Sequence, residues 1–352
     1  MKIEKLFRIL NHGDFTMGKF PYDILHKFVF SRLGKIDPSV LFGPSIGEDA
    51  AVVDLGNIAL ICHVDPITGA VENIGWLAVH IACNDVAVRG GEPRWILPCI
   101  LLPEQNSIEL LDKITLQIDK AAKTLGVMVI AGHTETTVGL ERPIITMTAI
   151  GLAPKEKIVP ISGAKPGDVV LVTKGIGLEG TSILATDFAH ELRKRGVPDE
   201  IIMNAREFIK EISVVKDALA IRDYATAMHD PTEGGLIGAL TELACASNVL
   251  IRIKEEDVLI RRETEIICSA LQVDPLKLIS SGTLLATVRR NLAEKAINKL
   301  QEIGITAKII GTVEKGYGVE IIRKDGSIEK FTKPVVKDEL FRLLEEEKIK
   351  FK

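Results

Sequence analysis

Four aspartates stand among apolar residues, where a carboxylate is unexpected. They occur in the segments GEDAAVV, LICHVDPITG, HIACNDVAV and AMHDPTEGG, as Asp49, Asp65, Asp85 and Asp230. A buried carboxylate is costly unless it is paired or binds a metal ion. Mg²⁺ is held in proteins by one or two carboxylates together with phosphate oxygens. Any one of these aspartates alone is more often a turn or cap residue, but the set of four favours a magnesium-phosphate site.

Two of the four aspartates share a local pattern. Asp65 and Asp230 each follow an apolar stretch and each precede a proline. Proline holds the residue before it in an extended conformation. We therefore expect each strand to stop with its carboxylate at its C-terminal end, where binding clefts of layered folds form.

Asp85 is expected on the buried face of a helix that starts after an N-cap at Asn73 and ends near Gly90. The apolar residues of this segment recur at helical spacing, and Asp85 falls on the same face. Arg89 lies four residues further on and could pair with it along the helix, and a metal ion is the alternative partner for this carboxylate. Asn84 lies close by.

Glycines and strand ends add support for a phosphate ligand. Gly47 precedes Glu48 and Asp49, and Gly234-Gly235 begins the helix after Asp230. Backbone N–H groups at a helix start attract phosphate. The segment 131–135 ends a predicted strand with the polar residues His133, Thr134 and Glu135 beside Gly132. Ordinary turns explain each glycine cluster equally well, and the glycine-rich segment 174–180 is not a Walker loop.

Lysine and histidine candidates have competing explanations. Lys19 lies on a glycine-containing preamble and is either a solvated lysine or one that closes over a triphosphate. The histidines are better explained as satisfied core or strand-end residues than as ligands: His63, His80, His133 and His229. His133 is kept as a candidate because it adjoins Thr134 and Glu135.

The chain has 352 residues, more than one hydrophobic core usually supports. The turn-rich segment 160–168 is the predicted junction between two α+β domains. The predicted parts are an extension at 1–40 with a flexible loop, domains at 41–158 and 159–335, and a tail helix at 336–352. Helices are predicted at 2–10, 22–33, 73–90, 107–125, 233–248 and 292–303, with further helices between the turn 174–180 and about residue 223. Strands are predicted at 50–54, 58–65, 95–102, 127–133, 144–152, 169–173, 225–229, 251–253, 282–288, 307–313, 317–323 and 328–331.

Composition excludes several classes of protein. The net charge of −4 and the lack of a basic stripe argue against a nucleic-acid binder. No run of about 18 uncharged apolar residues predicts a membrane span. The five cysteines are odd in number and form no C-x-x-C pair, which is typical of reduced thiols in the cytoplasm. The sequence therefore predicts a cytoplasmic protein without nucleic-acid or membrane partners.

Six motifs in a fixed order resemble a known family. They are GEDAAVV, VDPITG, NDVAVRGGEP, AGHTE, DPTEGGL and SSGTLL, and the resemblance covers about residues 16–331. The chain resembles the PurM-type superfamily of aminoimidazole ribonucleotide (AIR) synthetases. Within it, the hydrogenase expression/formation proteins of the HypE type and their archaeal relatives are most similar. Selenophosphate synthetase and thiamine-monophosphate kinase are more distant.

The resemblance implies a PurM-like α+β fold: an N-terminal domain that dimerises through its sheet and a C-terminal α/β sandwich. It implies a homodimer that uses ATP and Mg²⁺ and phosphorylates an oxygen, often of an amide. Asp85, Asp230 and His133 would be catalytic. The metal would be held by Asp49, Asp65, Asp85 and Asp230, and the nucleotide by these aspartates with Lys19, Gly47, Asn84, Gly132, His133, Thr134 and Glu135.

Two departures put the substrate in question. Proteins of the HypE type carry their substrate on a C-terminal cysteine, but this chain ends in EKIKFK and its last cysteine is Cys268. Glu233 stands where relatives commonly have Arg, which reverses a charge at the rim of the site. The sequence therefore predicts a separate, unidentified acceptor. Two alternatives stay open: a small-molecule kinase of the thiamine-monophosphate type, and a non-catalytic nucleotide-binding scaffold that docks through its tail helix.

Overall fold

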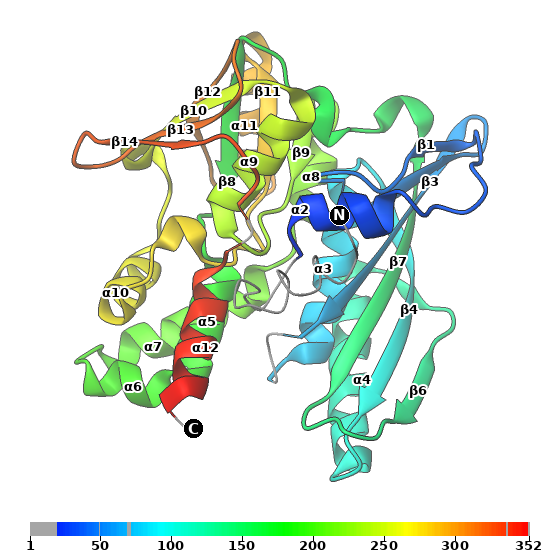
Figure 1. Ribbon diagram of the computed structural model, residues 1–352, viewed down its shortest axis with the longest axis vertical. Coiled ribbons are helices and arrows are strands. Elements are labelled where there is room, and N and C mark those ends of the chain that lie inside the picture. Colours follow the sequence, from blue (N-terminus) through cyan, green and yellow to red (C-terminus); the bar gives the residue numbers. More distant parts are fainter. Residues whose placement is uncertain (1–19, 49, 69–71, 336, 351–352) are drawn as a thin grey trace, which may run out of the picture.

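The computed structural model of the protein describes residues 20–48, 50–68, 72–335 and 337–350. Lys19, Asp49 and the helix predicted at 2–10 lie outside these residues. Figure 1 shows two sheets with their helices, placed side by side, and α3 (Ile74–Val88) between them. This arrangement confirms the predicted two-domain α+β architecture. No helix in the described part of the chain has the length and apolar character needed to cross a membrane.

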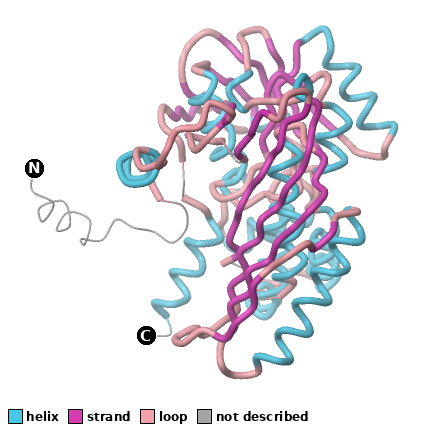
Figure 2. The backbone as a smooth tube through the Cα atoms, turned by 90° about the vertical axis from the view of Figure 1, so that its right-hand side faces the viewer, coloured by secondary structure: helices cyan, strands magenta, loops and turns pink. Residues whose placement is uncertain are grey.

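The first sheet has seven strands in the order β1-β2-β3-β7-β4-β5, with β6 pairing to β4. α3 and α4 (Ser107–Leu125) cover one of its faces, and Figure 2 looks onto the other, over which no helix of the described residues lies. Alternating residues of the long strands are buried beneath the helices, as a sheet with one covered face requires. Its strands are β1 (Val40–Phe42), β2 (Ala51–Asp54), β3 (Ile58–Ile67), β4 (Glu92–Leu102), β5 (Met128–Val129), β6 (His133–Thr136) and β7 (Ile144–Pro154).

The predicted end of β3 at Asp65 is wrong. The strand continues through Pro66 to Ile67 and stays paired with β7 along its whole length. On its other side, β3 is paired with β2 only from Ala59 to Cys62. Pro66 thus lies beyond the last residue of β3 that pairs with β2. Its missing N–H therefore removes no hydrogen bond to β2. Asp65 is therefore held within a strand rather than at its end.

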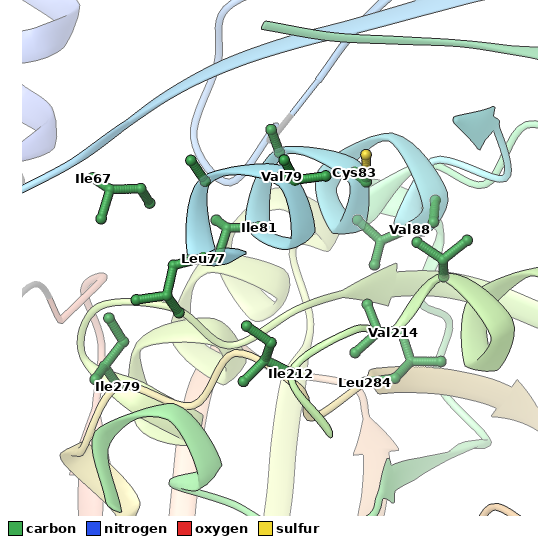
Figure 3. Close-up of a cluster of buried hydrophobic side chains, with 14 of the residues drawn as sticks. Ile67, Leu77, Val79, Ile81, Cys83, Val88, Ile212, Val214, Ile279 and Leu284 are labelled. Atoms are coloured by element: carbon green, nitrogen blue, oxygen red, sulfur yellow. The ribbon is translucent and has the colours of Figure 1, made fainter. Parts of the chain in front are cut away.

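Helix α3 is buried on every side, which the predicted amphipathic pattern did not anticipate. Nearly every side chain from Ile74 to Val88 is buried, including Asp85 as expected. One side faces the strands of the first sheet and the other faces α8 (Val215–Ile221) of the second domain. Figure 3 shows Leu77, Ile81 and Val88 of this helix above Ile212 and Leu284. The two domains thus share one continuous apolar core across α3.

The second sheet also has seven strands, in the order β14-β13-β10-β12-β8-β11-β9. Its pairings are antiparallel apart from β10 with β13. The strands are β8 (Asp168–Thr173), β9 (Ala225–His229), β10 (Leu250–Lys254), β11 (Leu285–Arg289), β12 (Ala307–Glu314), β13 (Gly318–Ile322) and β14 (Ile328–Phe331). The helices are α5 (Leu178–Asp187), α6 (Ala189–Lys194), α7 (Asp199–Arg206), α8, α9 (Gly235–Ser247), α10 (Arg262–Leu271) and α11 (Ala293–Glu302).

Both ends of the described chain pack near the domain junction. The predicted helix at 22–33 is shorter: α2 (Tyr22–Leu25) runs into one π-helical stretch, His26–Phe30. The tail helix α12 (Glu339–Lys350) lies beside α5 in Figure 1. Leu340 and Leu343 at its start are buried. The tail helix predicted from the sequence is therefore confirmed, with its first turn anchored in the core.

Candidate functional site

A small cavity lies between the two domains. Its volume is about 30 Å³, room for about two water molecules. Asp65 of β3 lines it from the first domain, and Glu179 of α5 and Glu233 line it from the second. Phe341 of the tail helix contributes an apolar wall. The cavity joins the segments around both predicted Asp-Pro motifs.

Glu179 is the most unusual group in this cavity. Its residue is 3 % exposed, and its carboxyl group has the side chain of Ser281 as a hydrogen-bond partner. Burial raises the pKa of Glu179 to about 7, and the nearby carboxylates of Glu233, Asp338 and Asp230 raise it further, while Ser281 opposes the shift. A carboxyl group with these properties gains or loses its proton near neutral pH.

Asp338, just before α12, is held by the loop that precedes α9. Its carboxylate accepts hydrogen bonds from the backbone N–H groups of Gly234 and Leu340, both at 2.8 Å. Burial raises the pKa of Asp338 to about 7 against the opposing effect of these hydrogen bonds. Gly234 has φ of +81°, and a Cβ there would lie 2.9 Å from the carbonyl oxygen of Val335. The segment before α12 is thus fitted closely onto the glycine-rich loop.

Asp85 has a partner that the sequence did not reveal. Its Oδ2 lies 3.2 Å from Nε2 of His63, on the strand that faces α3. His63 and Asp65 are two residues apart, so both side chains are on the helix-covered face of β3. The structure thus places Asp65, His63 and Asp85 on the same side of the first sheet.

Asn84 ties the two domains together. Its side-chain amide donates to the carbonyl of Ile212 and accepts from the N–H of Val214, both at 2.8 Å. The residue is fully buried. The carbonyl oxygen and the amide nitrogen of its side chain thus both bond backbone groups of the second domain, and its role in a nucleotide site stays a prediction.

Arg89, at the end of α3, binds three separate chain segments. Its guanidinium donates to the carbonyls of Gly47, Val159 and Met228 at 3.2 to 3.3 Å. Its Nε lies 3.4 Å from the carboxylate of Glu48, and the arginine side chain is fully buried. Gly47 has φ of +72°, and a Cβ there would come within 2.8 Å of Ile161. The predicted phosphate-binding glycine is thus fixed in place by a buried cation.

The end of β9 carries a second polar network. Nε2 of His229 lies 2.7 Å from Oε2 of Glu242 on α9, and both side chains are buried. The hydroxyl of Tyr22 donates to the other carboxylate oxygen of Glu242. Asp230 follows directly and is also fully buried. The strand end at His229 and the position of Asp230 just beyond it confirm the prediction for this motif.

A larger pocket lies on the other side of the first domain. Its volume is about 540 Å³, within the range of small-ligand pockets. Gly132, His133 and Thr134 line it together with residues of α4. The predicted strand at 127–133 is instead two short strands, β5 and β6, so His133 begins a strand rather than ending one. His133 and Glu135 are exposed and paired at 3.0 Å.

The predicted site residues therefore fall into two groups. Asp65, Asp85 and Asp230 lie near α3, whereas Gly132–Glu135 lie at the β6 edge. β7 and β4 separate β3 from β6 in the sheet, so the two groups are about 14 Å apart or more. Within residues 20–48, 50–68, 72–335 and 337–350, no three His, Cys, Asp or Glu side chains are gathered to hold a metal ion.

Sequence reasoning missed Glu179, Ser281, Asp338 and the contacts that Arg89 makes. Glu179 lies in the glycine-rich segment 174–180, which was judged only for its glycines. Arg89 is the one charged side chain between Asp85 and Glu92, a signal that could have marked it. Ser281 and Asp338 carry no local signal, because their importance comes from the contact of α12 and the 279–281 segment with α5.

Comparisons with known proteins fit this arrangement. The family described as AIR synthase related protein matches with its N-terminal domain at residues 47–153 and its C-terminal domain at 165–324. A putative hydrogenase expression/formation protein of Methanocaldococcus jannaschii is 31 % identical over 92 % of this chain and 94 % of its own length. A thiamine-monophosphate kinase of Pyrococcus abyssi is 30 % identical over 79 % and 86 %.

Solved structures give the same picture. A crystal structure of a HypE–HypF complex contains a chain with TM-score 0.69 and 26 % identity, which covers 88 % of this protein and 99 % of that chain. A HypE structure in complex with ATP has TM-score 0.65 at 24 % identity, covering 93 % and 98 %, and shows likeness of fold.

The two seven-stranded sheets, the junction helix α3 and the ordered motifs define a PurM-like protein. The chain belongs to the AIR synthase related family. Within that family it is similar to the hydrogenase expression/formation proteins of the HypE type.

Proposed function

We propose that this protein is an ATP- and Mg²⁺-dependent enzyme that phosphorylates an oxygen atom of a separate acceptor. The observation that carries the proposal is the placement of Asp65, Glu179 and Glu233 around one cavity, with the Asp230 carboxylate close enough to act on the pKa of Glu179. Carboxylates from both domains meet there beside a glycine-rich loop. Such a place suits the transfer of a phosphoryl group, where metal ions and backbone amides neutralise developing charge. Similarity to a kinase and to an ATP-bound HypE supports the proposal.

The carboxylate set fits magnesium in its chemistry. Mg²⁺ is bound by one or two carboxylates with water and phosphate oxygens, so a ready-made cage of three protein ligands is not needed. Asp65 and Asp230 would hold the ion, with Asp49 predicted to join them. When bound, the ion would bridge phosphate oxygens and offset their charge. Asp85 would orient His63 at the back of this group, as their 3.2 Å contact indicates.

Removing magnesium tests the proposal most directly. Purified protein is expected to release ADP or AMP from ATP with Mg²⁺ and to lose at least 90 % of this activity, roughly, when EDTA exceeds the metal. Restoring Mg²⁺ should restore turnover, whereas Ca²⁺ should not, because it prefers longer and more numerous oxygen contacts. ATP consumption that is indifferent to EDTA would contradict the proposal.

A homodimer through the open face of the first sheet would complete the site. That face exposes Ile58 and Val64 of β3, at 46 % and 57 %, and within the described part of the chain no helix covers it (Figure 2). Exposed apolar residues on an uncovered sheet are typical of an interaction surface.

Val64→Lys tests this dimer. We expect the dissociation constant of the variant dimer to be about tenfold or more higher than that of the wild type, because each copy would bury a lysine in the interface. Ile108→Lys, at an 83 % exposed position on α4, is the matched control and should leave the dimer intact. Analytical ultracentrifugation gives the mass of each variant. A wild type that is monomeric at micromolar concentration would show that the open face is not a dimer interface.

A small-molecule kinase of the thiamine-monophosphate type is the second candidate. It is favoured by the 30 % identity to the Pyrococcus abyssi enzyme over most of both chains. A panel of phosphate-acceptor compounds, assayed for ADP formation, separates it from an enzyme that acts on a protein-bound group.

A further inference from the structure

Glu242 on α9 joins two segments that are far apart in the sequence. One of its carboxylate oxygens, Oε2, lies 2.7 Å from Nε2 of His229, the last residue of β9. The other, Oε1, accepts a hydrogen bond from the hydroxyl of Tyr22, the first residue of α2. Glu242 and His229 are 5 % and 2 % exposed. Because an unpaired polar group in a dry core is costly, a buried carboxylate with a partner on each oxygen fixes both partners in place.

The turn at Gly47 lies next to the same side chain. A Cβ at Gly47 would come within 3.2 Å of Cβ of Glu242, so the turn approaches α9 closely. The carbonyl of Gly47 accepts a hydrogen bond from Arg89, which also donates to the carbonyl of Met228, the neighbour of His229. Arg89 therefore holds the main chain of the Gly47 turn and of β9, and Glu242 lies beside both.

Each of these segments leads to a residue that was predicted to bind the metal ion or the triphosphate: Asp230 directly after His229, Asp49 two residues after Gly47, and Lys19 three residues before Tyr22. The bond to Tyr22 is the most informative, because no residue of α2 or of the π-helical stretch His26–Phe30 is buried. A segment with so little apolar burial depends on polar contacts for its position. The buried carboxylate is such a contact.

We propose that Glu242 is a positioning residue of the phosphoryl-transfer site, and that Tyr22 is the contact through which the N-terminal segment joins that site. By binding Tyr22 and His229 with one carboxylate, Glu242 sets the place of the N-terminal segment relative to the strand end that leads to Asp230. The affinity for nucleotide then depends on a tyrosine hydroxyl that lies outside the metal-binding set. This inference rests on the proposed function, because it adds two positioning residues to the same site.

Hydrogen–deuterium exchange of the full-length protein, without nucleotide, tests the contact itself. Tyr22→Phe keeps the ring and removes the donor, so we expect the amides of residues 21–30 to exchange about tenfold faster, as loss of a hydrogen bond to a charged group predicts. Glu242→Gln keeps an acceptor for Tyr22 and should stay within about threefold of the wild type. Tyr317→Phe is the matched control, because its hydroxyl bonds Cys245 and not Glu242. Equal exchange in Tyr22→Phe and the wild type would overturn the inference.

Binding of Mg²⁺-ATP, measured by isothermal titration calorimetry, tests the consequence for the site. Tyr22→Phe should raise the dissociation constant about tenfold, and the loss should appear in KM rather than in kcat, because Asp230 keeps its own contacts. Glu242→Ala should lose at least as much affinity, and Glu242→Gln should recover most of it. A Tyr22→Phe protein that is less stable but binds Mg²⁺-ATP as the wild type does would show a merely structural contact and refute the positioning role.

The two experiments separate this inference from the proposed function. A wild type that binds no ATP, combined with faster exchange in Tyr22→Phe, would refute the proposed function and leave the anchoring of the N-terminal segment by Glu242 intact. A wild type with Mg²⁺-dependent turnover, combined with unchanged nucleotide affinity in Tyr22→Phe, would overturn this inference and leave the proposed function standing.

Discussion

Asp230→Asn is expected to lower Mg²⁺-dependent ATP turnover by about 10²–10³-fold while the protein stays folded. Asp230 is fully buried and follows directly after β9, close enough to Glu179 to act on its pKa. Asparagine has nearly the same shape but lacks the charge that would hold a metal ion. The loss should therefore appear in kcat, measured as phosphate or ADP release, with an unchanged circular-dichroism spectrum.

Two further variants provide a second test of the site and a control. Asp85→Asn should lose turnover as well, because the amide can no longer hold His63 as a charged acceptor does. Asp223→Asn removes an exposed carboxylate whose salt bridge with Lys157 lies at the surface, and it should keep full activity. Turnover retained in both the Asp85 and Asp230 variants would refute the assignment of these aspartates.

Local sequence signals were sufficient to predict the bounds of helices and strands that depend only on their own residues. The helix Ser107–Leu125 was predicted to the residue, because its apolar residues keep helical spacing and Gly126 ends it in a left-handed conformation. Strand Ala225–His229 was predicted to the residue as well, since Asp230-Pro231 closes it.

The same proline rule failed at Asp65-Pro66 for a reason outside the local sequence. Whether proline ends a strand depends on whether a neighbouring strand needs a backbone N–H at that position. The pairing of β3 with β2 extends only to Cys62, so β2 needs no N–H from residue 66. β5 and β6 were predicted as one strand because the apolar run 127–131 continues into His133. Helix α10, Arg262–Leu271, was not predicted at all, although four of its residues are buried at helical spacing.

The burial of Asp85 and Asp230 could be predicted from the sequence, but their surroundings could not, and the role of the aspartates stays a prediction. Asp65, Asp85 and Asp230 stood out because a carboxylate in apolar company is costly. Glu179 and Asp338 are just as buried, but their neighbours come from distant segments, so nothing within a few residues reveals them. Positions Lys19 and Asp49 stay predictions, because they lie outside the described residues.

The position of α3 explains why this site sits between domains. The helix is enclosed by the first sheet and by α8, and its polar residues contact groups on both sides. Asp85 contacts His63 of the first sheet, whereas Asn84 bonds the backbone at Ile212 and Val214. A shift of the domains would therefore break hydrogen bonds in a dry core, and the cavity beside α3 is held to one geometry.

Arg89 at the end of α3 is expected to be the residue whose loss costs the most stability. Arg89→Met should lower the free energy of unfolding by about 3–5 kcal/mol, because it leaves the carbonyls of Gly47, Val159 and Met228 buried without this donor. The carboxylate of Glu48 would also lose its nearby cation. Urea denaturation followed by tryptophan fluorescence measures this change.

The chemistry of the guanidinium predicts a further difference. Arg89→Lys keeps the charge, but one ammonium group lacks the planar fork that reaches three carbonyls, so about 2 kcal/mol should still be lost. Arg193→Met removes an arginine whose pair with Asp199 is exposed, and it should cost less than about 1 kcal/mol. An Arg89→Met variant as stable as Arg193→Met would mean that the buried carbonyls find other donors. If the large loss is observed, the nucleotide affinity of Arg89→Lys should fall too, since Gly47 and the strand that leads to Asp230 are positioned by the same guanidinium.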